Sequence, residues 1–385
     1  MASVEVGQKV VVSRPLLDEI LRALRKEEYT LLGPTLRDGV IAYDEIQGSH
    51  SLPEGWTDEQ EAGRYRIWRR DDKALFGYTV GPHSWKTFLH PPRLTLWRAE
   101  RRQRGFEIDN EKPESRKLAL VGVRSCELHA IDIQDRVMLN GQHPDPHYAS
   151  RRADLFVIAV HCTEPGHTCF CSSMQTGPRA TCGYDLALTE IVQQGRHDFV
   201  VEAGSEAGAG ILGHVHFQPA DEPTLKTADE AVESAAQKMR RKMETRGLRD
   251  LLNRNLENTH WEKVAQRCLG CANCTLVCPT CFCTSVEDVS DLGGQRAERV
   301  RVWDSCFNPS FSYIHGGSVS ASLASRYRQW LTHKLASWWD QFGTPGCVGC
   351  GRCITWCPAC IDITEEVRAI RDSDATTRPQ NVEVS

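Results

Sequence analysis

Two cysteine runs with the same spacing constrain this chain more than any other feature. Each run reads C-x2-C-x2-C-x3-C, and each is followed by a proline. The first run is Cys268, Cys271, Cys274 and Cys278, and the second run is Cys347, Cys350, Cys353 and Cys357. Three thiolates on a tight loop can reach three irons of one [4Fe–4S] cube, while the fourth ligand comes from elsewhere in the chain. The two copies therefore predict two [4Fe–4S] clusters.

The proline after each run predicts how the ligands are shared. In two-cluster ferredoxins the cysteine before the proline binds the other cluster. This rule assigns cluster 1 to Cys268, Cys271, Cys274 and Cys357. It assigns cluster 2 to Cys347, Cys350, Cys353 and Cys278. The exchange would hold the two clusters close together, which suits electron transfer. A zinc-stabilised scaffold is the alternative, but zinc does not require three cysteines at two-residue intervals.

Composition favours a cytoplasmic chain. The 385 residues give room for two or three domains, and the net charge of −5 offers no basic surface for nucleic acid. No apolar stretch is long enough to cross a bilayer, and Met1–Val12 lacks an apolar signal core. Seventeen cysteines, an odd number, in a long chain of this kind are typical of metal ligands rather than of disulfides.

Hydrophobic periodicity predicts a mixed α/β domain over residues 1–225. Helices are expected over residues 14–27, with Ser13 as N-cap, and over 127–140 and 185–193. Strands are expected over residues 29–32, 39–43, 65–68, 74–79, 118–123, 155–160 and 199–202. The segment 118–160 is a strand–helix–strand unit, which normally places its two strands parallel in one sheet.

Residues 226–365 are predicted to be mostly helical, so the expected fold class of the whole chain is α+β. Thr227 and Glu230 form a capping box that would open a long linking helix, broken near Gly247, within residues 226–258. Apolar residues at helical spacing between the two runs predict a mostly helical, ferredoxin-like dicluster domain over 259–365. A polar tail, 366–385, follows and is expected to be loose from Ile370 onward.

Four further cysteines predict a third cluster. Cys126 follows the strand 118–123 by three residues, and Cys162 follows the strand 155–160 by two. The carboxyl ends of parallel strands meet at one edge of a sheet, where such sheets bind ligands. Cys169 and Cys171 lie on the loop that leaves this edge, and Cys182 is a substitute ligand. The site would give electrons a second entrance or exit. Buried, inert thiols are the alternative.

Other motifs carry less information. The remaining cysteines near the runs, Cys281, Cys283, Cys306 and Cys360, are expected to pack as small apolar residues, with a redox dithiol as the alternative. The segment Gly208–Gly213 reads G-x-G-x-x-G, but it precedes an extended-looking stretch and is expected to be a loop. The chain should therefore not bind NAD(P)H tightly by itself. No catalytic residue is assigned.

Several motifs together resemble one known family. They are Gly122–Leu128, Cys162–Gly166 with Cys169 and Cys171, Gly183–Glu190, Gly346–Pro358 and Gly81–Lys86. They are similar to the iron–sulfur beta subunit of cytoplasmic sulfhydrogenases and to the dicluster iron–sulfur subunit of anaerobic sulfite reductase. The resemblance covers residues 40 to 365.

The resemblance implies an electron-transfer subunit of a hetero-oligomeric oxidoreductase. Its partners would be a flavoprotein subunit that binds FAD and NAD(P)H, and a catalytic subunit that is either a [NiFe] hydrogenase or a sulfite reductase. The alternative is a thiol–disulfide redox subunit like those of heterodisulfide reductases. The terminal enzyme and the choice between NAD and NADP stay open.

Overall fold

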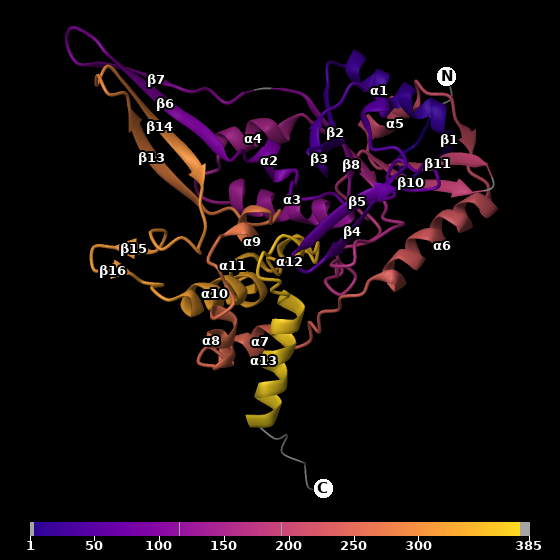
Figure 1. Ribbon diagram of the computed structural model, residues 1–385. Helices are drawn as coiled ribbons and strands as arrows, with labels where there is room; N and C mark the ends of the chain where they lie inside the picture. The colour runs from indigo at the N-terminus through magenta and orange to yellow at the C-terminus, as the bar shows by residue number, and fades with distance from the viewer. Residues whose placement is uncertain (1–3, 115, 194, 378–385) are drawn as a thin grey trace.

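An eight-stranded mixed sheet forms the N-terminal region of the computed structural model, which describes residues 4–114, 116–193 and 195–377 (Figure 1). The strand order is β12–β1–β11–β10–β9–β8–β2–β3. The strands are β1 (Lys9–Ser13), β2 (Thr30–Arg37), β3 (Val40–Glu45), β8 (Leu118–Val123), β9 (Leu155–Val160), β10 (Leu186–Gln193), β11 (Arg196–Ala203) and β12 (Gln218–Pro219). The central strands β2, β8, β9 and β10 are parallel, and the outer pairs are antiparallel.

The strand–helix–strand unit is confirmed. Strand β8 is followed by α3 (Ser125–Met138) and α4 (Pro146–Ala153), and the chain returns through β9 parallel to β8. All six residues of β8 are buried, as expected for a strand covered on both faces. The carboxyl ends of β8, β9 and β10 thus lie at one edge of the sheet, and the loop that carries Cys162 begins there.

Two expectations about residues 74–79 and 185–193 are wrong. Residues 186–193 are strand β10 rather than helix, because pairing with β9 on one side and β11 on the other satisfies their backbone groups. Residues 74–79 form no strand. Instead, the carboxylate of Glu190 accepts the backbone N–H groups of Leu75 and Phe76 at 2.6 and 2.9 Å.

Helices around the sheet agree in part with their predictions. The helix expected over 14–27 is a 3-10 turn, Arg14–Leu16, followed by α1 (Leu17–Lys26), and Ser13 makes no side-chain cap. The Gly208–Gly213 segment, expected as a loop, lies almost entirely within the short helix α5 (Glu206–Leu212). A Cβ at Gly208 would lie 1.9 Å from the carbonyl oxygen of Asp185, so this glycine allows close packing on the sheet.

The long linking helix is shorter and begins earlier than predicted. Helix α6 spans Glu222–Lys238, is capped by Asp221, and packs against β10 and β11. Thr227 lies inside it and donates its hydroxyl to the carbonyl of Pro223, so the expected capping box is wrong. Residues 239–245 form neither helix nor strand. The Nε of Arg241 donates to Asp362, and the backbone N–H of Met243 donates to the hydroxyl of Ser173 instead of to a helical carbonyl.

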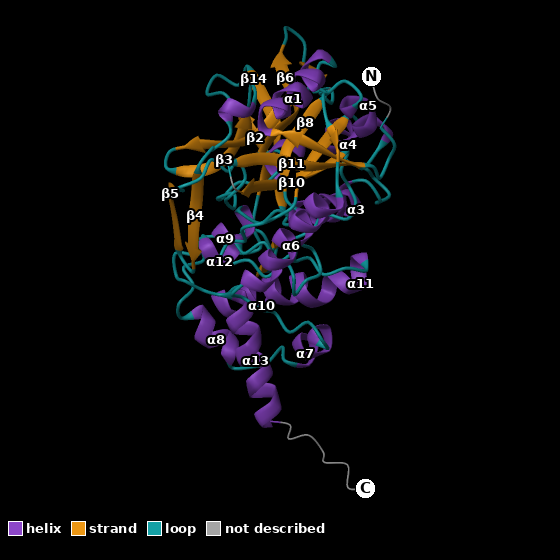
Figure 2. Ribbon diagram, turned by 90° about the vertical axis from the view of Figure 1, so that its right-hand side faces the viewer, coloured by secondary structure: helices purple, strands orange, loops and turns teal. Residues whose placement is uncertain are grey.

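The C-terminal region holds most of the remaining helices (Figure 2). They are α7 (Leu248–Arg254), α8 (His260–Ala265), α9 (Asn273–Leu276), α10 (Leu323–Thr332), a π-helical turn (His333–Ser337), α11 (Trp338–Phe342), α12 (Arg352–Thr355) and α13 (Ile363–Thr377). The tail expected to be loose from Ile370 is helical through the end of α13, because Val367 and Ile370 are buried in the C-terminal core. Residues 378–385 lie outside the described part of the chain.

A second sheet joins segments that are far apart in the sequence. It has the order β13–β14–β6–β7 and projects from the body as an arm (Figure 1). Its strands are β6 (Arg93–Arg101), β7 (Phe106–Asn110), β13 (Thr284–Ser290) and β14 (Arg296–Trp303). The C-terminal region is therefore less purely helical than expected. The division at residues 225, 258 and 365 stays a prediction.

Smaller elements complete the fold. They are the hairpins β4 (Trp56–Glu61) with β5 (Arg64–Arg69) and β15 (Tyr313–Ile314) with β16 (Gly317–Ser318), the short helix α2 (Lys86–Leu89) and a 3-10 turn at Ser49–Ser51. Among the described residues, no helix is long and apolar enough to cross a membrane.

Candidate iron–sulfur centres

The two cysteine runs fold into loops of the same shape. The residues on either side of the second cysteine of the first run, Gly270 and Ala272, have φ values of +62° and +64°. Their counterparts in the second run, Gly349 and Gly351, have φ values of +65° and +76°. Left-handed conformations turn the backbone tightly, so successive thiols can face one centre. Each loop ends in one helical turn, α9 or α12, and these two helices contact each other.

The first cavity receives thiols from both runs. Its cysteines are Cys268, Cys271, Cys274, Cys353 and Cys357. Among them Cys353 and Cys357 come from the second run, whereas Cys278 does not line this cavity. The other walls are mainly apolar and include Phe307, Tyr327 and Trp330. Burial raises the pKa of Cys274, and so do the adjoining thiols of Cys268 and Cys357.

The second thiol group is Cys278, Cys347, Cys350 and Cys353. Burial raises the pKa of Cys353, and the nearby thiols of Cys347, Cys350 and Cys278 add to this effect. The Nζ atom of Lys334 lies 3.3 Å from the sulfur of Cys278. The structure thus brings the last cysteine of each run to the other run's group, and Cys353 adjoins both groups.

These surroundings fit [4Fe–4S] clusters. The first cavity offers sulfur donors in an apolar shell, which is the donor set that such clusters require. In the second thiol group, the buried ammonium of Lys334 faces sulfur and needs a negative charge there. Among the described residues, no three His, Cys, Asp or Glu side chains are arranged to hold a single metal ion. The thiols of the first cavity instead line a space between them, as ligands of a cluster would.

The third cysteine set, Cys126, Cys162, Cys169 and Cys171, also converges. Burial raises the pKa of Cys126, and so do the nearby thiols of Cys171 and Cys162. Burial raises the pKa of Cys169 to about 12, with a contribution from Cys162. The four residues come from the start of α3 and from the loop after β9, as the strand ends predicted. Cys182 is exposed and has no described contact with the set.

The third set lies against the second run, although it is distant in sequence. The N–H of Phe170 donates to the carbonyl of Gly349 at 2.8 Å. A Cβ at Gly349 would lie 2.7 Å from the Cα of Cys171, and one at Gly351 would lie 2.5 Å from the carbonyl oxygen of Thr168. Only glycines permit this approach. The thiol of Cys169 points to the carbonyl of Cys350 at 3.6 Å.

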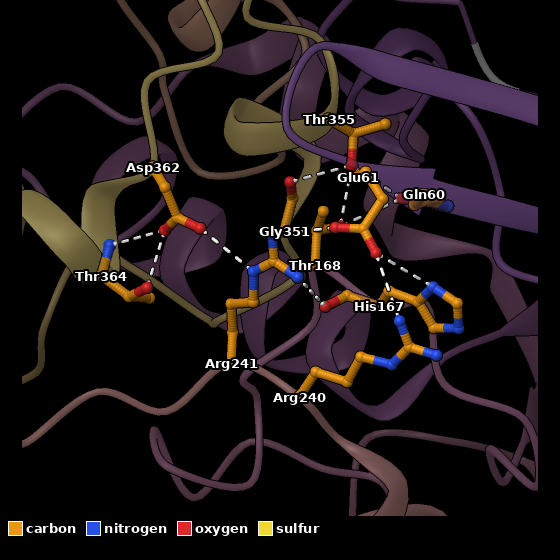
Figure 3. A network of polar contacts seen from close by, with 10 residues as sticks. All are labelled: Gln60, Glu61, His167, Thr168, Arg240, Arg241, Gly351, Thr355, Asp362 and Thr364. Carbon is orange, nitrogen blue, oxygen red and sulfur yellow. Dashed lines mark hydrogen bonds and ion pairs between the residues drawn. The ribbon is translucent and has the colours of Figure 1, made fainter.

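A buried polar network holds these loops together (Figure 3). The hydroxyls of Thr168 and Thr355 lie 2.8 Å apart, and both donate to the side-chain oxygen of Gln60, at 3.2 and 2.8 Å. The linker after α6 takes part through Arg241, whose Nε donates to Asp362 at 3.1 Å. The β4–β5 hairpin, the loop of the third set and the second run are therefore fixed relative to one another.

Sequence reasoning missed the buried charges beside these thiols. Arg124 lies 3.9 Å from the sulfur of Cys162 and donates to the carbonyls of Phe76 and Tyr78. Arg352, between two cysteines of the second run, donates to Glu127 at 2.6 Å. The sequence did carry a signal for these buried charges. Arg124 and Glu127 flank Cys126, and Arg352 lies inside a cysteine run.

The other cysteines fall into two groups. Cys281, Cys283 and Cys306 lie near the runs: the sulfur of Cys281 adjoins that of Cys278, and Cys306 adjoins Cys274 and Cys283. Cys360 is exposed and packs against the β4–β5 turn, where a Cβ at Gly63 would lie 2.7 Å from its sulfur.

Comparison with known proteins agrees with this geometry. Residues 267–361 match the family of 4Fe–4S dicluster domains. Together with the two thiol groups, this match defines an iron–sulfur electron-transfer protein with two [4Fe–4S] clusters. Sulfhydrogenase 2 subunit beta of Pyrococcus furiosus is 33% identical over 303 residues, which cover 77% of this chain and 86% of that protein. The chain belongs to the family of sulfhydrogenase beta subunits.

Proposed function

We propose that this chain relays electrons between a flavoprotein subunit, which binds FAD and NAD(P)H, and a [NiFe] hydrogenase or sulfite reductase catalytic subunit in the cytoplasm. The exchange of the last cysteine between the two runs carries this proposal, because it supports two neighbouring centres within one chain. A bound [4Fe–4S] cluster accepts and returns one electron. The similarity to a sulfhydrogenase beta subunit supports the hydrogenase partner.

The protein's own residues have three tasks in this proposal. Cysteines of both runs hold the clusters, with Cys268, Cys271, Cys274 and Cys357 at cluster 1 and Cys347, Cys350, Cys353 and Cys278 at cluster 2. Apolar residues such as Tyr327 and Trp330 exclude water from the first cavity. We propose that Cys126, Cys162, Cys169 and Cys171 hold a third [4Fe–4S] cluster beside the second run, which extends the relay toward the sheet.

The relay requires an external source of electrons. Purified, cluster-loaded protein is expected to stay oxidised when NADPH or NADH is added alone. The G-x-G-x-x-G segment lies in α5, which has only seven residues and packs tightly on the sheet, so it offers no dinucleotide site. Addition of the flavoprotein subunit should then bleach the cluster absorbance at a rate that depends on the flavoprotein concentration. Dithionite serves as the control for clusters that can be reduced. Rapid reduction by NADPH without the flavoprotein would contradict the proposal.

A thiol–disulfide function is the second candidate, and one observation favours it. The backbone N–H of Cys306 donates to the sulfur of Cys283, so these two thiols adjoin each other beside the clusters. Joined as a disulfide, they would release two protons and two electrons, which two one-electron centres together accept.

Alkylation distinguishes the two candidates. Under the relay, both thiols should be alkylated to the same extent in oxidised and dithionite-reduced protein, and the C283A/C306A double variant should keep the wild-type electron-transfer rate. Mass spectrometry of labelled peptides checks the first outcome, and stopped-flow spectroscopy checks the second. Labelling of Cys283 and Cys306 only after reduction would favour the thiol–disulfide function instead.

A further inference from the structure

Lys334 is a buried cation with an unusual set of partners. It belongs to the π-helical turn His333–Ser337 and is 4% exposed. Its Nζ atom lies 3.3 Å from the sulfur of Cys278, 3.0 Å from the hydroxyl oxygen of Thr280 and 3.0 Å from the carbonyl oxygen of Gly346. An ammonium group has three hydrogens, so each of these acceptors can receive one. Single π-turns often occur at functional sites.

No carboxylate balances the charge of Lys334 in the described part of the chain. Arg352, a buried cation inside the second run, donates to Glu127 and is thereby paired inside the protein. The partners of Lys334 are a carbonyl, a hydroxyl and a sulfur. A buried, unpaired charge is costly, so the sulfur of Cys278 must carry the negative charge that balances Lys334. A cluster-bound thiolate meets this need, whereas a neutral thiol does not.

Among the residues that the structure describes between 4 and 377, none makes such a contact with the first cavity. The described hydrogen bonds to its sulfurs come from the backbone, with Gly270 N–H to Cys268 and Ile361 N–H to Cys357, both at 3.4 Å. The two thiol groups therefore differ in charge although their loops have the same shape. Hydrogen bonds to sulfur and the local net charge are among the factors that set the reduction potential of an iron–sulfur cluster.

We propose that Lys334 raises the reduction potential of cluster 2 above that of cluster 1. Reduction adds a negative charge to a cluster, and the ammonium of Lys334 stabilises that charge because it lies in a site without bulk water. Lys334 acts through Cys278 and is a potential-setting residue rather than a catalytic one. The inference rests on the proposed cluster ligands and assigns a direction to the relay: electrons move downhill from cluster 1 to cluster 2.

An EPR-monitored redox titration of the full-length, cluster-loaded protein tests this assignment. The signals of the two clusters are assigned beforehand with the variants Cys268→Ser and Cys347→Ser. In the wild-type protein, we expect cluster 2 to be reduced at the higher potential. Lys334→Met removes the charge, and the ratio of reduced to oxidised cluster 2 at the wild-type midpoint should fall at least tenfold, which is about 59 mV for one electron.

Lys334→Arg is the matched control, since it keeps the positive charge and should shift this ratio less than Lys334→Met does. A wild-type order with cluster 1 at the higher potential would overturn the inference, even if neutral variants failed to fold. An unchanged potential in Lys334→Met with full iron content would also overturn it. Wild-type protein with fewer than about eight iron atoms per chain would instead overturn the proposed function.

Discussion

Replacing Cys278 with serine is expected to damage cluster 2, although Cys278 belongs to the first run. Its sulfur adjoins Lys334 and the cysteines of the second run, and it does not line the first cavity. Conversely, Cys357→Ser should damage cluster 1, because Cys357 lines that cavity with Cys268. Each change should remove up to four iron atoms per chain, or alter the EPR and Mössbauer signature of one cluster only.

The neighbouring cysteines allow a sharp control for this experiment. Cys281 adjoins Cys278 and is the residue best placed to replace it as a ligand. The double variant C278S/C281S prevents that rescue, whereas Cys281→Ser alone should keep both clusters. Cys360→Ser is the corresponding control for Cys357, since Cys360 is exposed. Damage confined to the cluster of the mutated residue's own run would show that the ligands are not exchanged.

Anaerobically purified protein is expected to be brown and to hold about twelve iron atoms per chain if the third cysteine set binds a cluster. Cys169→Ser should lower this number to about eight and leave the signals of clusters 1 and 2 in place. The reason is the convergence of four thiols whose pKa values are raised by burial. Neighbouring thiols of the set raise the pKa values of Cys126, Cys169 and Cys171 further. Iron and acid-labile sulfide assays measure the loss.

Cys182→Ser is the matched control for the third cluster. Cys182 follows the same loop but is exposed, so its replacement should leave the iron content unchanged. The full chain is required for both variants, because the loop of the third set packs against Gly349 and Gly351. Wild-type protein that contains about eight iron atoms after reconstitution would mean that these thiols are inert.

Sequence reasoning predicted the parts of this protein that depend on local spacing. The cysteine intervals anticipated the two loops, and the strand ends at Val123 and Val160 anticipated the meeting of Cys126 with Cys162. These features follow from side-chain periodicity and from the geometry of parallel strands. Both can be recognised in the amino-acid sequence of a single chain. The N-terminal sheet and the α+β class are confirmed for the same reason.

The failures occur where distant segments decide the structure. Residues 186–193 have a helical pattern of apolar side chains, yet β9 and β11 offer them backbone partners on both sides. The linker after Lys238 leaves its helix because Arg241 and Met243 find partners elsewhere in the fold. Lys334 gives no local sign of its role, since only the packing of the π-helical turn brings it to Cys278.

The arm has a consequence for the order in which this protein can fold. Strand β6 pairs with β14, and Arg98 donates to Glu298 across 200 positions of sequence. Closing so long a loop is slow, and in a chain emerging from the ribosome the edge of β6 that β14 later covers stays unpaired until residue 303 has been made. An unpaired strand edge can pair with other chains and aggregate. We therefore expect a chaperone to cover this edge of β6 during synthesis, and chaperone dependence to end once β14 has been synthesised.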